Sequence, residues 1–113
     1  MQKQAISKTN RISAFKAREI TRLIQGKTVA EAIALVDFSP RKAARLVGKA
    51  LKSAVANAEN DPENPVSRED LVVLEAVVGE GPTMKRIRPK ARGMAGRVRK
   101  RTSHIKIVVT TED

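Results

Sequence analysis

The sequence predicts an α+β domain in which three helices pack on a small, mostly antiparallel three-stranded sheet, with a long extended β-hairpin. Helix-capping residues and apolar positions at helical spacing recur between residues 13 and 59. Two β-branched segments, 71–78 and 105–111, are typical of strands. The stretch 82–104 contains nine Lys or Arg and no acidic residue, and this composition indicates an extended connection rather than a packed element.

The first two elements follow from short local patterns. Residues 3–12 alternate weakly in polarity and favour a strand. Ser13 is suited to cap a helix, and Gly26 can end that helix in a left-handed conformation. The apolar side of this helix is expected to consist of Ala14, Ala17, Ile20, Leu23 and Ile24.

Two further helices are predicted before residue 60. Thr28 and Glu31 have the spacing of a capping box, which starts a second helix through residues 29–36. Ser39 and Pro40 supply an N-cap and a first-turn proline for a third helix, residues 40 to about 59. The apolar half of that helix comprises Leu46, Val47, Ala50, Leu51, Ala54, Val55 and Ala58.

The other side of the third helix is basic. At 100° per residue a set of five cations falls on or beside one arc, namely Arg41, Lys42, Arg45, Lys49 and Lys52. No acidic residue lies among them to form the i,i+4 pairs that a merely solvated helix often uses. We therefore expect this stripe to contact phosphate, and the alternative is a solvated charged face.

A polar loop at 57–70 precedes the first of the two β-branched strands. The segment 82–104 then connects that strand to the second. Pro89 interrupts any helix, and Gly93 and Gly96 allow a turn near the middle. Two extended arms of about ten residues each, at ~3.3 Å per residue, would carry the tip roughly 30 Å from the domain. Arg-rich arms bind phosphates bidentately and stack on bases, so the hairpin is suited to a crevice in folded RNA.

Composition limits the classes of function. The chain has 113 residues, a net charge of +11 and a pI of about 10.8, which suit one domain with a polyanionic partner. It lacks cysteine, and His104 is its single histidine, so we expect no enzyme, metal, cofactor or small-molecule substrate. The N-terminus does not have the pattern of a signal peptide, and no apolar run is long enough for a membrane span.

The stretch EGPTMKRIRPKARGMAGRVRKRTSHIKIVV, together with RKAARLVGKALKSAVANAE upstream, resembles the bacterial large-subunit ribosomal protein L22 family over nearly the whole chain. The resemblance implies a structural constituent of the cytoplasmic ribosome, which binds and organises 23S rRNA during assembly beside neighbouring large-subunit proteins. It also implies one domain, with a globular part at 1–81 and 102–113. A protruding hairpin at about 82–101 would line the exit tunnel and meet the nascent polypeptide. The alternative is a general RNA-binding or RNA-chaperone protein outside the ribosome.

The resemblance also implies which residues touch RNA. In the globular part we expect RNA contacts at Lys8, Arg11, Lys16 and Arg18, and at the basic stripe of Arg41, Lys42, Arg45, Lys49 and Lys52. Along the arms and their base they are Lys85, Arg86, Arg88, Arg97, Arg99, Lys100, Arg101 and His104. The tunnel-lining tip would consist of Lys90, Ala91, Arg92, Gly93, Met94 and Ala95.

Three positions depart from the family pattern. Met94 stands where the family commonly has a basic residue, and Gly79 stands where an Asp is often found. Phe15 replaces the Arg of the common Ser-Pro-Arg-Lys-Ala-Arg motif. We expect Phe15 to pack against the domain instead of making a basic contact with RNA.

Overall fold

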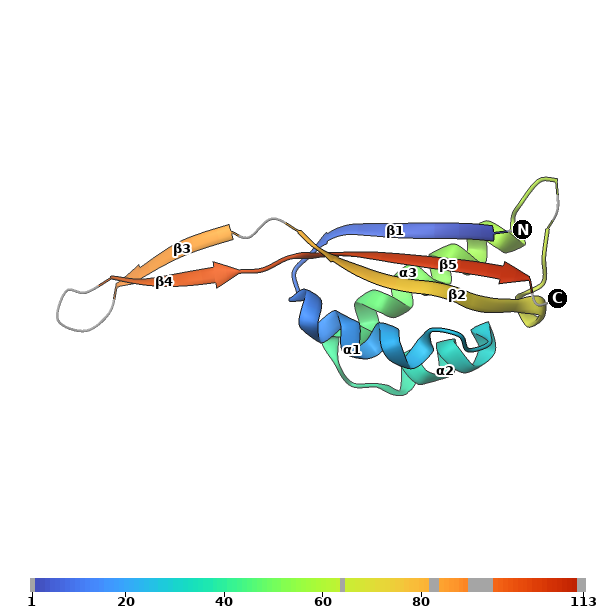
Figure 1. Ribbon diagram of the computed structural model, residues 1–113, viewed down its shortest axis with the longest axis horizontal. Helices are drawn as coiled ribbons and strands as arrows, with labels where there is room; N and C mark the ends of the chain where they lie inside the picture. The colour runs from blue at the N-terminus through green and yellow to red at the C-terminus, as the bar shows by residue number, and fades with distance from the viewer. Residues whose placement is uncertain (1, 64, 82–83, 90–94, 112–113) are drawn as a thin grey trace.

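The computed structural model describes residues 2–63, 65–81, 84–89 and 95–111 (Figure 1). The elements are β1 (Gln2–Asn10), α1 (Ala14–Ile24), α2 (Val29–Phe38), α3 (Lys42–Glu59), a 3-10 turn (Arg68–Asp70), β2 (Leu71–Glu80), β3 (Met84–Pro89), β4 (Ala95–Lys100) and β5 (Ser103–Thr111). A three-stranded antiparallel sheet has the order β1-β5-β2, and β3 pairs with β4 as a separate ribbon. The predicted α+β class is confirmed.

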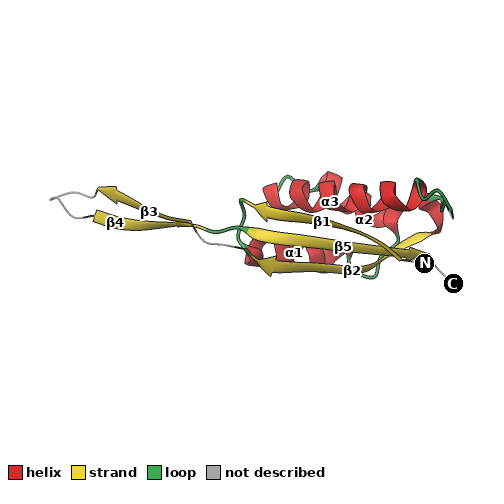
Figure 2. Ribbon diagram, turned by 90° about the horizontal axis from the view of Figure 1, so that it is seen from above, coloured by secondary structure: helices red, strands yellow, loops and turns green. Residues whose placement is uncertain are grey.

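The three helices cover one face of the sheet and leave the other face open (Figures 1 and 2). In the central strand β5, Ile105, Ile107 and Val109 are fully buried on the helix side. Val108, at an alternate position, is also buried. On the open face, Lys106 pairs in register with Ile6 of β1 and Val77 of β2. All apolar residues of the main core belong to the helices, to the three-stranded sheet or to Ile12, as far as the described residues extend.

Both predicted N-caps of the first two helices are confirmed. The Ser13 hydroxyl accepts a hydrogen bond from the Lys16 amide at 3.4 Å, and the Thr28 hydroxyl accepts one from the Glu31 amide at 3.3 Å. Gly26 has a φ of +82°, so it ends α1 in the left-handed region as predicted. Its amide donates to the carbonyl of Val73 on β2 at 2.9 Å, which ties the link between the two helices to the edge of the sheet.

Two details of the predicted helices are wrong. The third helix begins at Lys42 with Arg41 as N-cap, not at Pro40, because Ser39 is the C-cap of α2 and its hydroxyl accepts from the Arg41 amide at 3.4 Å. A residue before proline disfavours the helical conformation, so α2 ends there and the chain needs two more residues to turn. Leu23, which the periodicity predicts on the packed side of α1, is 54% exposed.

The basic ribbon leaves the domain at a tight junction. The Gly81 amide donates to the Thr102 carbonyl at 3.0 Å. A Cβ at position 81 would lie 2.5 Å from the Thr102 hydroxyl, so the close approach of the two arms requires glycine. From there β3 and β4 pair in register from Met84↔Lys100 to Pro89↔Ala95, and the molecule measures 63 × 26 × 16 Å.

Ser103 supports a first prediction, on stability. Its side chain is fully buried at the start of β5, and its hydroxyl has no hydrogen-bond partner among the described residues. A buried unsatisfied hydroxyl costs about 1–3 kcal/mol. We expect Ser103→Ala to raise the free energy of unfolding by about 1 kcal/mol in urea titration. The matched control is Ser13→Ala, which removes a cap and should lower it by about 1 kcal/mol. A clear loss of stability in Ser103→Ala would contradict the absence of a partner.

Candidate nucleic-acid interface

A groove between α2 and α3 carries most of the predicted basic stripe. The two helices approach closely where Gly48 faces Val36, since a Cβ at position 48 would lie 3.1 Å from the Val36 Cγ2 atom. The groove has a volume of about 580 Å³. Four of the five predicted stripe cations line it, namely Arg41, Arg45, Lys49 and Lys52. The structure therefore brings these four side chains to one concave surface.

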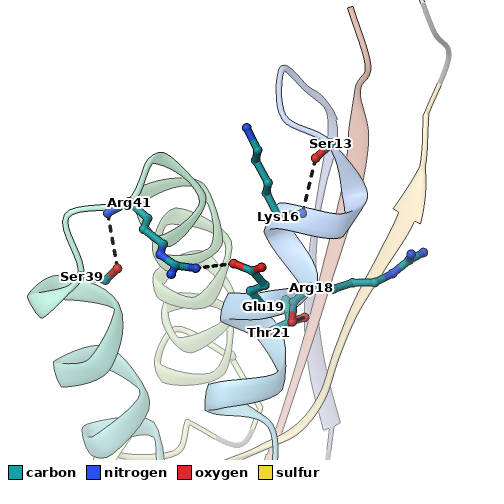
Figure 3. A network of polar contacts seen from close by, with 7 residues as sticks. All are labelled: Ser13, Lys16, Arg18, Glu19, Thr21, Ser39 and Arg41. Carbon is teal, nitrogen blue, oxygen red and sulfur yellow. Dashed lines mark hydrogen bonds and ion pairs between the residues drawn. The ribbon is translucent and has the colours of Figure 1, made fainter.

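Two of the four cations are paired with acidic residues from other helices. Arg41 forms an ion pair with Glu19 of α1 (Figure 3), and the Lys52 ammonium lies 2.9 Å from the Asp37 carboxylate of α2. Because both acidic partners lie on other helices, periodicity within α3 could not indicate them. Both pairs are largely exposed, and such pairs contribute about 0–1 kcal/mol, so a phosphate can compete for either cation.

The side chains of Arg45 and Lys49 form no hydrogen bond or ion pair with the part of the chain that the structure describes. They occupy successive turns of α3 and point into the same groove as the paired cations. Their charges are fully available to a ligand. Within the groove they are the best candidates for phosphate contacts, because a ligand need not displace a carboxylate to reach them.

The fifth stripe cation, Lys42, lies apart from this groove. Its ammonium donates to the carbonyl of Arg11 at 2.8 Å, which joins the start of α3 to the turn before α1. The side chains of Arg11 and Lys8 are exposed. Lys42, Arg41 and Lys16 line a second groove beside α1, of about 420 Å³. The N-terminal basic residues thus lie on one end of the helical layer, together with the start of α3.

Arg18 has a structural contact that the sequence did not indicate. Its guanidinium donates to the carbonyl of Val78 on β2 at 3.0 Å, and the side chain is half-buried. Figure 3 shows this side chain extending away from the cluster formed by Lys16, Glu19 and Arg41. Arg18 therefore anchors α1 to the edge strand, and it lies away from the two basic grooves.

The expectation that Phe15 packs against the domain is wrong. Its ring is 72% exposed and lines the second groove. Helical geometry explains the error, because the packed residues of α1 follow the i, i+3, i+4 pattern from Ala14 and Ala17, and position 15 falls outside that face. The same helical periodicity that predicts the core therefore also predicts that Phe15 is exposed.

The remaining predicted residues belong to the ribbon and its base. His104 is half-buried on the open face of β5, and Arg101 is exposed where β4 ends. For β3 and β4 the structure describes backbone and register, which place Lys85, Arg86, Arg88, Ala95, Arg97, Arg99 and Lys100 on the two paired arms. Lys90, Ala91, Arg92, Gly93 and Met94 lie outside the described residues.

Lys106 is a basic surface residue that the sequence reasoning missed. Its side chain lies on the open face between Ile6 and Val77, two apolar residues that are each 50% exposed. The alternation Ile105-Lys106-Ile107 could have identified it, because the neighbours point into the core. No cluster of three or more potential metal ligands occurs among the described residues, and no helix among them has the length and hydropathy of a bilayer span.

Comparison with known proteins gives consistent matches. The family model of ribosomal protein L22p/L17e matches residues 5–110. The chain is 55% identical over 107 residues to large ribosomal subunit protein uL22 of Pediococcus pentosaceus, covering 95% of this chain and 89% of the relative. It is 55% identical to the protein of that name from Ligilactobacillus salivarius (96% and 93% covered) and 50% identical to that from Halothermothrix orenii (97% and 96% covered).

Proposed function

Because the chain belongs to the ribosomal protein L22p/L17e family, we propose that it is a structural constituent of the large ribosomal subunit that binds large-subunit rRNA. The observation that carries this function is the match over residues 5–110, with 50–55% identity to uL22 proteins of similar length. The net charge of +11 agrees with an RNA partner. The protein is not an enzyme, and it acts in the cytoplasm within the ribosome, beside other large-subunit proteins.

The groove between α2 and α3 provides the phosphate contacts of the globular part. Arg45 and Lys49 make the principal contacts, because they have no competing partner among the described residues. Arg41 and Lys52 contribute less, since a phosphate must first displace Glu19 or Asp37. Lys8, Arg11, Lys16 and Lys42 extend the basic surface around the first turn of α1. Arg18 supports this surface by holding α1 on β2.

The β3–β4 ribbon enters the folded rRNA. It extends from the sheet along the 63 Å axis of the molecule as two paired strands, separate from the helices (Figures 1 and 2). A two-stranded ribbon has too little apolar area for a core of its own, so the surrounding RNA supplies its packing and neutralises its charge. In this proposal the segment 90–95 forms part of the wall of the exit tunnel and meets the nascent polypeptide. The chain then acts as one unit, with its globular part at 1–81 and 102–113.

Neutralising Arg45 and Lys49 tests the rRNA-binding role. We expect Arg45→Gln/Lys49→Gln to reduce the slope of log K against log salt by about 1.4 to 1.8, because two phosphate contacts are lost. The measurement is a filter-binding titration with large-subunit rRNA at several salt concentrations. An unrelated duplex RNA of equal length serves as competitor, and weak competition distinguishes this role from general RNA binding.

The matched control is Arg41→Gln/Lys52→Gln, which removes the same net charge from the same groove. Its slope should change by less, because Glu19 and Asp37 already compensate the two cations. Equal slopes for the two double variants would show that net charge alone matters and would contradict the assignment. A competitor duplex that displaces the wild-type protein as well as rRNA does would contradict the ribosomal role.

A further inference from the structure

Phe15 is an exposed aromatic ring in a chain that has very few aromatic residues. The sequence contains two, Phe15 and Phe38, and neither joins the described core. Phe15 lies in the first turn of α1 and is 72% exposed. Burial of such a ring would stabilise the folded protein by about 1.5–3 kcal/mol, and an exposed ring does not contribute this free energy. The stability of the isolated domain therefore does not explain why position 15 is aromatic.

The surroundings of Phe15 distinguish it from Phe38. Phe15, with Ile12 and Ala43, forms the apolar part of a groove of about 420 Å³ between the start of α1 and the start of α3. This volume lies within the range of about 300–1,000 Å³ found for small-ligand sites. Phe38 lies at the last residue of α2, is 92% exposed, and lines none of the grooves described above. Of the two rings, Phe15 is the one that lines a groove described above.

Charged groups around the same groove favour an anionic ligand. Lys16, Arg41, Lys42 and Glu19 line it, so three cations oppose one carboxylate. Glu19 is already engaged by Arg41 (Figure 3). The Lys42 ammonium is positioned by the Arg11 carbonyl at 2.8 Å but keeps its charge, and the Lys16 side chain points outward from α1 in Figure 3. A ligand with an apolar face and a negative group matches this combination.

We propose that Phe15 is a stacking platform for one unpaired nucleotide of large-subunit rRNA, with the neighbouring phosphate held by Lys16 and Lys42. The inference rests on the proposed function. An exposed base has a flat π-face that an aromatic ring can cover, and bases in duplexes have both faces already stacked. The basic rim explains why a nucleotide, rather than an uncharged apolar side chain of a neighbouring protein, occupies the groove.

A tryptophan reporter tests the stacking contact directly. The chain contains no Trp, so Phe15→Trp introduces a single indole whose emission is quenched when it stacks on a base. Titration of the full-length variant with protein-free large-subunit rRNA should quench this emission. Phe38→Trp is the matched control, because it places the same reporter at the other exposed aromatic position. The proposal predicts little quenching there, and equal quenching at both positions would overturn it.

Affinity measurements separate stacking from simple apolar contact. Phe15→Leu keeps apolar area but removes the π-face, and should weaken rRNA binding roughly tenfold, while Phe15→Tyr should stay within about twofold of wild type. The salt slope should not change, because no charge is altered. If Phe15→Leu binds as tightly as wild type, the stacking site is wrong although the proposed function stands. If wild type itself shows no preference for large-subunit rRNA, the proposed function fails first. Thermal melts of all variants verify folding, which substitution of an exposed ring should not disturb.

Discussion

Replacing residues 83–100 by an Asn-Gly turn is expected to give a folded domain that no longer stays on large subunits pelleted through high salt. The three-stranded sheet and the described core lie outside the replaced segment, and Gly81 and Thr102 remain to close the shortened hairpin. The replacement removes eight Lys or Arg, each of which contributes about 0.7–0.9 to the salt slope if it contacts a phosphate. We therefore expect a loss of rRNA affinity of at least about a hundredfold at moderate salt.

A smaller replacement separates the contribution of the tip from that of the two arms. Substituting an Asn-Gly turn for residues 89–95 keeps most of both arms and removes only Lys90 and Arg92 from the eight basic residues. This variant should remain on the large subunit in high salt. Both variants should show a single cooperative thermal transition by circular dichroism. Loss of cooperative melting in the long replacement would mean that the core depends on the ribbon. Co-sedimentation equal to wild type would mean that the globular part alone anchors the protein.

Gly48→Val is expected to lower the free energy of unfolding by about 1–2 kcal/mol. A Cβ at position 48 would lie 3.1 Å from Val36 Cγ2, so added methyl groups must force α2 away from α3. Overpacking of this kind costs about 1–3 kcal/mol, and the better helix propensity of Val returns only a few tenths. The measurement is urea unfolding followed by circular dichroism. The same change should widen the groove that presents Arg45 and Lys49.

Gly79→Val provides the matched control for that substitution. Position 79 lies in β2, and a Cβ there meets nothing within 4 Å. A β-branched residue suits an extended strand better than glycine does, so this variant should be unchanged or more stable by up to about 1 kcal/mol. Equal destabilisation at the two positions would contradict the packing explanation, because glycine flexibility would then be the shared cause.

The helices could largely be predicted from sequence because their signals are local. Ser13 and Thr28 cap their own helices, and Gly26 ends α1, so each decision depends on a few neighbouring residues. The start of α3 was misplaced because Ser39 is suited both to end one helix and to begin the next. The predicted cap, Ser39, and the observed cap, Arg41, are separated by Pro40, and local propensity does not determine which of the two begins the helix.

The distribution of free and paired cations could not be predicted in the same way. Glu19 lies 22 positions from Arg41, and Asp37 lies 15 positions from Lys52, so these ion pairs exist only after three helices have packed. The basic stripe itself followed from helical periodicity, but its division into paired and unpaired residues is a tertiary property. Phe15 illustrates the opposite case, because its exposure followed from a periodicity that was available in the sequence.

The central position of β5 determines the order in which the domain can be completed during translation. β1 and β2 take their sheet partners from β5, and Gln2 pairs with Thr110 across nearly the whole described chain. Such distant pairings form slowly, because the entropy cost of closing a long loop comes before any stabilising contact is made. The helices, in contrast, can form from local contacts. The basic ribbon precedes β5 in the chain. In a newly made molecule the charged ribbon is therefore synthesised before the sheet can form. RNA that binds the ribbon at this stage binds a protein whose central strand β5 is not yet in place.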